Sequence, residues 1–174
     1  MLRFRIFLLS GLILGLLSAC SGFKALDSRG CPAPVRVTDA SSYTVFKKGT
    51  GRDIIDVAFR GQIDKAVISC VYRNDLMRST IRFEIIATKG PAANGDEVSL
   101  PFFVAIVDNR NNIIAKQIFD TTITFDKGRR RAGVFEEIEQ NIQLKPRERA
   151  DIFRILFGFQ LSREQVERRQ KRSR

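Results

Sequence analysis

The side chains that could do chemistry in this chain of 174 residues are carboxylates and cysteines, because the sequence contains no histidine. Without histidine there is no Ser-His-Asp or Cys-His arrangement for nucleophilic catalysis. Two carboxylate groupings remain for a hydrolase, Asp53 with Asp56, and the acids Glu136, Glu137 and Glu139. Acids at alternating strand positions are usually solvated. We therefore predict no catalytic residues and no enzyme.

Cys20, the first of three cysteines, closes an apolar segment near the start of the chain. Arg3 and Arg5 precede the apolar run 6–17, which is shorter than the roughly 20 residues of a membrane span and is typical of a signal peptide. The tetrad "LSAC" at 17–20 resembles the lipobox of bacterial lipoproteins. That resemblance implies cleavage before Cys20, a diacylglycerol thioether on its sulfur, and an acyl chain such as palmitate on its amino group. The alternative is an ordinary signal peptide cut nearby.

The lipid anchor determines the expected location. One acyl chain binds a membrane only marginally, whereas two or three chains anchor a protein stably. In Gram-negative lipoproteins an aspartate after the lipidated cysteine signals retention in the inner membrane, and here that residue is Ser21. The resemblance therefore implies the periplasmic side of the cell envelope, at the outer membrane rather than the inner membrane.

Cleavage would leave 155 residues, the length of one ordinary domain. We assign residues 1–19 to a signal peptide and 20–30, rich in small and polar residues, to a lipidated tether. Residues 31–161 form the domain, and 162–174 form a basic tail. An edge strand is the alternative for the tether.

Cys31 and Cys70 remain once Cys20 carries lipid, and an even number of cysteines in an oxidising compartment predicts a disulfide. It would close a loop of about 39 residues and contribute roughly 4 kcal/mol in the chain-entropy model. Metal binding is the alternative, but two thiolates without histidine do not make a zinc site. We predict no metal and no cofactor.

Most of the domain carries strand patterns. Apolar residues alternate in "IRFEIIA" (81–87) and "DIFRILFGFQL" (151–161), and "LPFFVAIV" (100–107) is apolar on both faces, as in a central strand. Residues 134–144 fit either a strand or a helix, and the surrounding strands favour a strand. Further strands are expected at 43–46, 54–59, 66–72, 113–119 and 121–125. This succession predicts an all-β fold, a single antiparallel β-sandwich of immunoglobulin-like type.

The tail has a different composition. Residues 162–174 contain one large apolar residue, Val166, with six basic and two acidic residues. Ser162 and Gln165 fit a capping box, and Glu164 with Arg168 is an i,i+4 pair worth about 0.2 to 0.5 kcal/mol. Since a helix with no apolar face gains little from packing, we predict a short basic helix of a turn or two, or a disordered tail.

The formal charge is +11, and removal of the signal's two arginines leaves +9, a balance that attracts anionic partners. The tail has no aromatic residue for base stacking, and an exported protein does not meet the chromosome, so no nucleic acid is expected. If the loops "KKGTGR", "KGPAANGDE" and "DKGRRR" share an end of the sandwich, their basic residues could face an anionic partner. The alternative is solvated turns at opposite ends, the charge then serving solubility. The candidate binding residues are Lys47, Lys48, Arg52, Lys89, Arg129, Arg130 and Arg131.

Five short segments, "CPAP", "GTGRDIIDV", "KGPAA", "LPFFVAIVD" and "GFQL", resemble an uncharacterised group of Gram-negative envelope lipoproteins across roughly residues 31–161. The resemblance implies the class of protein and no particular activity. We predict a non-enzymatic, membrane-anchored lipoprotein that acts as a binding or scaffolding module for an envelope protein. The second hypothesis is a binder of an anionic envelope polymer or lipid, such as lipopolysaccharide or a cell-wall polymer. The third is a hydrolase that uses carboxylates.

Overall fold

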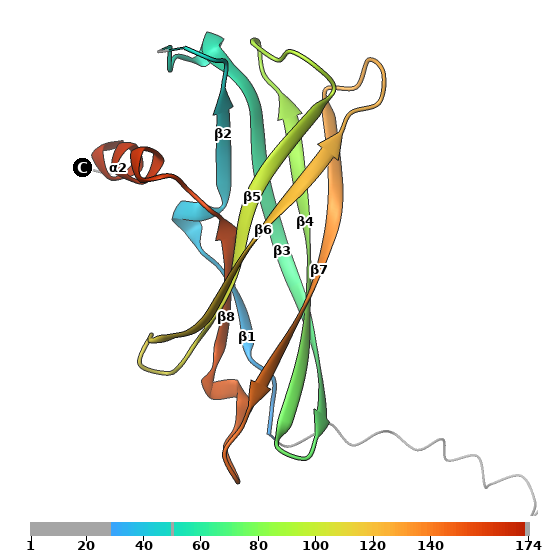
Figure 1. Ribbon diagram of the computed structural model, residues 1–174, viewed down its shortest axis with the longest axis vertical. Helices are drawn as coiled ribbons and strands as arrows, with labels where there is room; N and C mark the ends of the chain where they lie inside the picture. The colour runs from blue at the N-terminus through green and yellow to red at the C-terminus, as the bar shows by residue number, and fades with distance from the viewer. Residues whose placement is uncertain (1–28, 50, 173–174) are drawn as a thin grey trace, which may run out of the picture.

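The computed structural model describes residues 29–49 and 51–172. Within them eight strands form two four-stranded sheets that pack face to face, one in the order β1-β8-β5-β6 and the other in the order β2-β3-β4-β7 (Figure 1). The strands are β1 (Ala33–Arg36), β2 (Ser42–Phe46), β3 (Val57–Arg73), β4 (Leu76–Lys89), β5 (Glu97–Val107), β6 (Ile113–Thr124), β7 (Arg131–Gln143) and β8 (Arg154–Phe159). Three 3-10 turns and one helix complete the fold: η1 (Thr38–Ala40), η2 (Ile54–Asp56), η3 (Ala150–Ile152) and α2 (Arg163–Arg172).

The predicted antiparallel sandwich is confirmed, and only the pair β1 and β8 runs parallel among the described strands. The hairpins β3–β4 and β5–β6 each stay within one sheet. The chain then returns so that β7 lies beside β4 and β8 lies beside β5. These crossings between sheets are of the Greek-key kind that β-sandwiches share.

The core is built from alternating side chains of both sheets. On β4 the residues Ile81, Phe83 and Ile85 are fully or almost fully buried, as their spacing predicts. The Phe83 ring stacks on Phe157 at 5.1 Å between centroids and meets the edge of Phe102 at 5.6 Å. The interdigitated aromatic rings join the sheets and set where their connecting loops emerge.

Two strands each join two segments that were predicted separately, and one of them starts later than predicted. The segments 54–59 and 66–72 largely belong to one strand, β3, which absorbs the polar residues between them at a bulge after Ile63. Residues 54–56 form η2 instead of a strand, because the Asp53 N–H donates to Asp56 Oδ2 at 3.1 Å and closes a turn. The segments 113–119 and 121–125 likewise share the single strand β6.

The predicted disulfide is present. Cys31 and Cys70 are bonded, with their Cα atoms 6.0 Å apart. Beside them the Tyr72 hydroxyl donates to the Gly30 carbonyl, and the Arg29 guanidinium lies 4.1 Å from the centroid of the Tyr72 ring. We call this group of five residues the N-terminal clamp. The last two residues of the predicted tether are therefore bound to the domain, whereas Cys20 lies outside the described residues.

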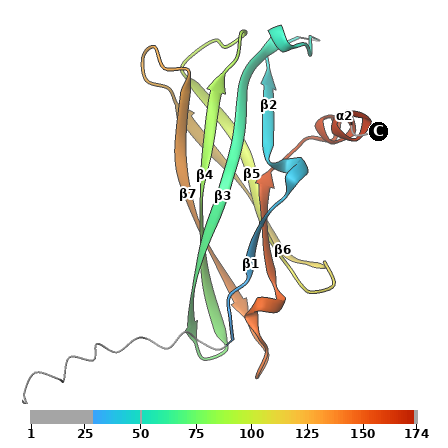
Figure 2. The same cartoon turned by 180° about the vertical axis from the view of Figure 1, so that it is seen from behind.

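The tail forms a helix longer than the predicted turn or two. The ten residues of α2 begin at the predicted capping box, in which the Ser162 N–H donates to Gln165 Oε1 at 2.9 Å and the Gln165 N–H donates to Ser162 Oγ at 3.3 Å. Figures 1 and 2 both show α2 standing beside β2. None of the helical segments among the described residues combines the length and apolarity that a membrane crossing needs.

Polar side chains, rather than apolar ones, hold α2 against β2. Gln165 Nε2 donates to the Thr44 carbonyl at 3.3 Å, and Arg169 donates to the Ser42 carbonyl at 2.6 Å. Because β2 is the edge strand of its sheet, these carbonyls have no neighbouring strand to pair with. Side chains of α2 thus donate hydrogen bonds to carbonyl groups on the exposed edge of β2. These bonds explain why α2 is ordered although it has no apolar face.

Candidate functional site

The three loops that carry the predicted binding residues lie at one end of the sandwich. Strands β2, β4 and β6 all run toward this end (Figure 1). The Gly90 N–H donates to the Ala58 carbonyl at 2.7 Å, and the Lys89 N–H donates to the Arg130 carbonyl at 2.9 Å. These bonds join the β4–β5 connection to the start of β3 and to the β6–β7 loop, so the loops are not at opposite ends.

At this end, four of the candidates form one group around the β6–β7 loop. Lys89 forms an ion pair with Asp96, and its ammonium lies 4.9 Å from the centroid of the Phe125 ring. Arg130 donates to the Lys89 carbonyl at 2.9 Å. Lys89 and Arg130 therefore hold the loops together, and Arg129 in the β6–β7 loop and Arg131 at the start of β7 are exposed.

The other three candidates, Lys47, Lys48 and Arg52, line an open groove of about 920 Å³ between β2, α2 and the β2–β3 loop. We call it the basic groove. Six cationic side chains and one carboxylate, that of Glu164, are among the residues that line it. The six are Lys47, Lys48, Arg52, Arg60, Arg168 and Arg169.

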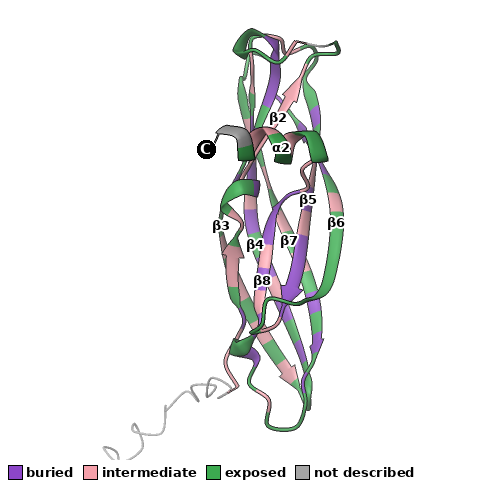
Figure 3. Cartoon of the chain, turned by 90° about the vertical axis from the view of Figure 1, so that its left-hand side faces the viewer, coloured by how far each residue is buried: buried purple, intermediate pink, exposed green. Residues whose placement is uncertain are grey.

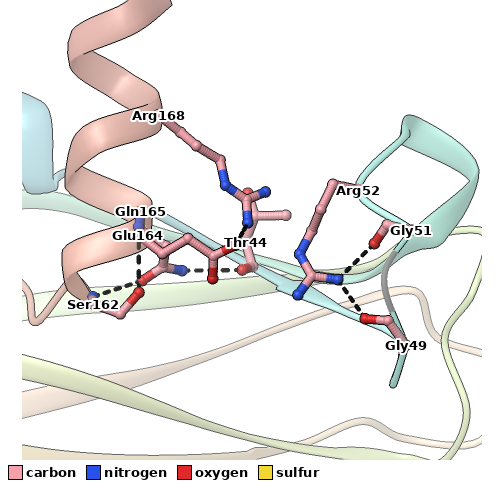
Figure 4. A network of polar contacts seen from close by, with 8 residues as sticks. All are labelled: Thr44, Gly49, Gly51, Arg52, Ser162, Glu164, Gln165 and Arg168. Atoms are coloured by element: carbon pink, nitrogen blue, oxygen red, sulfur yellow. Dashed lines mark hydrogen bonds and ion pairs between the residues drawn. The ribbon is translucent and has the colours of Figure 1, made fainter.

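Two guanidinium groups face each other across the basic groove. Arg52 reaches in from the β2–β3 loop and Arg168 from α2 (Figure 4). Their Cζ atoms lie 5.4 Å and 5.9 Å from the centroid of the same Phe46 ring. Arg52 is also held by the Gly49 and Gly51 carbonyls, each 2.7 Å from its Nη1 atom. Backbone carbonyls thus hold Arg52, the Glu164 carboxylate holds Arg168, and both guanidinium groups lie beside the Phe46 ring.

The positive charge of the basic groove is only partly neutralised. Lys47 is paired with Asp56 and Arg168 with Glu164. Arg52 and Arg169, by contrast, donate to carbonyl and hydroxyl oxygens, which carry no net charge. Lys48 and Arg60 are exposed, and no ion pair links either to another described residue. The groove therefore presents an excess of positive charge to solvent.

The carboxylates considered for hydrolysis are occupied elsewhere. Asp56 has a side chain only 8% exposed, and its Oδ1 lies 2.7 Å from Lys47 Nζ. The hydrogen bond from Lys47, together with that from the Asp53 N–H, holds the pKa of Asp56 below its ordinary value. Asp56 is thus an ionised structural acid that closes the β2–β3 loop.

The glutamates of β7 are divided between the two faces of their strand. Glu136 lies opposite Phe83 and Glu137 opposite Arg82, so their side chains alternate across the sheet. Glu137 accepts from Arg82 Nε at 2.9 Å. Among the described residues no group of three or more cysteine or carboxylate side chains is arranged to hold a metal ion.

Three of the six cationic residues that line the basic groove were not among the predicted binding residues. Arg168 and Arg169 belong to the tail, whose basic composition was noted without its docking position, and Arg60 lies within β3. The capping box indicated where α2 starts, but nothing in the sequence indicated that α2 would rest on β2.

No protein-family model, curated protein or solved structure matches the chain.

Proposed function

We propose that this protein is a non-enzymatic, lipid-anchored binding module on the periplasmic side of the cell envelope, and that its basic groove binds an anionic envelope polymer. The observation that carries the proposal is the groove itself, with six cationic side chains and one carboxylate among its lining residues. The lipobox resemblance supports the anchor at Cys20, and Ser21 favours the outer membrane.

The arrangement of arginines favours an anion with several oxygens. A guanidinium presents a planar fork of N–H donors that matches a carboxylate or a phosphate with two parallel hydrogen bonds. Arg52 and Arg168 both lie beside the Phe46 ring, and we propose that one anionic group accepts hydrogen bonds from both. Lys48 and Arg60 extend the cationic surface, which suits a chain of repeated charges better than one isolated ion.

The position of the groove favours a polymer over the headgroups of the anchoring membrane. The described chain starts at the end of the sandwich opposite the loops, where the N-terminal clamp lies (Figure 1). Strand β3 runs between the two ends with 17 residues, which at roughly 3.3 Å per residue is a length of about 56 Å. A lipid attached before Arg29 would leave the loop end facing away from its own membrane. The cell wall and the surface of the opposite membrane lie in that direction.

The test uses the mature lipidated chain in a neutral detergent, incubated with purified peptidoglycan sacculi and, separately, with lipopolysaccharide. Arg52→Glu and Arg168→Glu reverse the two facing cations. Arg78→Glu makes the same change of charge on the exposed face of β4, outside the groove. We expect each groove variant to bind at least tenfold more weakly, the control to bind as the wild type does, and all binding to fall with added salt.

Comparable loss in the Arg78→Glu control would contradict the proposal, because net charge rather than the groove would then govern binding. Binding to lipopolysaccharide but not to sacculi would identify the ligand as a phosphorylated glycolipid and not a cell-wall polymer. Binding to neither probe at low salt would refute an anionic envelope ligand for this groove.

A further inference from the structure

Strand β6 is an edge strand that the described fold leaves uncovered. Its sheet has β5 as the neighbour on one side and no strand on the other. The first half of β6 is exposed along its whole length (Figure 3), and Ile113, Ile114 and Ile118 are 63%, 55% and 57% exposed. An apolar edge with unpaired backbone N–H and C=O groups is a template for pairing with another strand.

The other three sheet edges are protected in ways that β6 is not. The helix α2 covers β2, and β1 has only four residues. Strand β7 carries three glutamates. Charges, short length and coverage are the usual means of preventing association at a sheet edge. Strand β6 has twelve residues. A bulge at Ile114 interrupts its start, and residues 115–119 beyond the bulge contain no proline and a single charge, that of Lys116.

The outer face of β6 is complementary to itself. On this face Lys116 lies opposite Ala105 of β5, Ile118 opposite Phe103 and Asp120 opposite Pro101. From Lys116 to Asp120 the face therefore reads basic, apolar and acidic. When such a strand meets a second copy running antiparallel and centred on Ile118, each Lys116 lies opposite an Asp120.

We propose that β6 is the interface through which two copies of this chain pair, antiparallel and edge to edge, with Ile118 opposite Ile118. This register puts Ile114 opposite Thr122 and joins the two four-stranded sheets into one continuous sheet. Cross-strand pairs of opposite charge and of apolar residues are the contacts that stabilise antiparallel ladders. The basic groove lies beside β2, on the other sheet. The proposal for β6 therefore does not depend on what the groove binds.

Charge selects this register over its neighbours. Since paired residues of an antiparallel ladder point to the same face, centring the pair on residue 116 brings two lysines together, and centring it on residue 120 brings two aspartates together. Centring it on 117 or 119 places a charged residue opposite Ile118. Among the registers centred on residues 116 to 120, only the one centred on Ile118 pairs both charges with opposite charges.

Cysteine crosslinking of the full chain in its membrane tests the register. Ile118→Cys puts the two new thiols opposite each other at the twofold centre. Ile114→Cys is the control, since Ile114 is similarly exposed on the same strand, but its two copies would lie about 27 Å apart at 3.4 Å per residue. We expect a disulfide-linked dimer on a non-reducing gel from Ile118→Cys and not from Ile114→Cys.

Charge exchange provides the second measurement, by chemical crosslinking of the membrane-bound chain. Lys116→Asp or Asp120→Lys alone should lower the dimer yield at least fivefold by placing like charges opposite each other, and the two changes together should restore it. Equal crosslinking from both cysteine variants, no crosslinking from Ile118→Cys, or a crosslinked band containing a different protein would overturn the proposal. Failure of the double exchange to restore the dimer would overturn the register.

Discussion

Lys47 Nζ lies 2.7 Å from Asp56 Oδ1, and this ion pair ties the end of β2 to the start of β3. The Lys47 N–H also donates to the Asp56 carbonyl at 2.9 Å, so the two residues are joined through both backbone and side chain. Lys47 was predicted to bind a partner, and Asp56 was considered for hydrolysis. Both residues instead stabilise the loop that forms one wall of the basic groove.

Asp56→Asn should destabilise the domain at neutral pH and matter less in acid. Because the folded pKa of Asp56 is lowered, the ionised carboxyl stabilises the fold fully above its unfolded pKa, about 3.9. That stabilisation is lost as pH falls through the lower folded pKa. The deficit of the variant relative to the wild type should therefore shrink below about pH 4. Urea denaturation across this range checks it, with Asp126→Asn on an exposed turn as the control. A deficit that grows in acid would contradict the assignment.

Removing the disulfide should cost the domain about 2 to 5 kcal/mol, because the bond restricts a long loop of the unfolded chain. The double variant Cys31→Ser, Cys70→Ser avoids an unpaired thiol, and urea denaturation of the full chain measures the loss. Treatment of the wild type with a reductant should produce the same shift. A double variant as stable as the wild type would show that the rest of the N-terminal clamp suffices.

Gly61→Ala should destabilise the sandwich by about 1 to 3 kcal/mol, the usual cost of overpacking a core. A Cβ atom at Gly61 would lie 2.8 Å from Phe159 Cζ and 2.9 Å from Leu100 Cδ1, both in the core. Gly133→Ala is the control, because a Cβ there would chiefly meet the flexible end of the Glu84 side chain at 2.8 Å. Thermal melting should show a clear loss for the first variant and little change for the second.

Arg169→Ala should loosen α2 while leaving the sandwich folded. The guanidinium of Arg169 donates to the Ser42 carbonyl at 2.6 Å and to Ser42 Oγ at 3.2 Å, and also to the Asp39 carbonyl. Water can replace these bonds at an edge strand, so the loss should be about 1 kcal/mol. Hydrogen exchange of the α2 amides should become faster, and binding in the basic groove should weaken. Arg163 is exposed on the same helix, so Arg163→Ala should change neither the hydrogen exchange of α2 nor binding in the basic groove. Unchanged hydrogen exchange of α2 in Arg169→Ala would show that Arg169 does not hold the helix against β2.

The strands with regular alternation could be predicted, and those defined by distant partners could not. Residues 81–87 alternate strictly and lie in β4, and Cys31 with Cys70 form the expected bond. Strand β1 was missed because its four residues are paired in parallel with β8, more than a hundred residues away in the chain. Residues 60–65 were not included in a predicted strand, but β3 continues through them with a bulge between Ile63 and Ala66.

Only half of the six cations that line the basic groove were predicted, because the other half come together through contacts between distant parts of the chain. Lys47, Lys48 and Arg52 share one loop, so local composition was enough to select them. Arg169 meets Ser42 across 127 residues of sequence, and no local pattern encodes such a meeting. The capping box and the Glu164–Arg168 pair could indicate that a helix forms, but the partner that fixes it is a sheet edge that exists only after folding.

The N-terminal clamp has a mechanical consequence. Under the proposed anchor, a pull between the membrane and a ligand in the basic groove enters the described chain at Arg29. Strand β1 is paired with β8 over only four residues, so few hydrogen bonds would resist such tension there. The bond between Cys31 and Cys70 precedes β1 and transmits the force to β3 instead, whose 17 residues are hydrogen-bonded to β4 along most of their length. The load is then shared by many bonds in shear, so the domain should stay folded under the tension that the proposed anchor and ligand would produce.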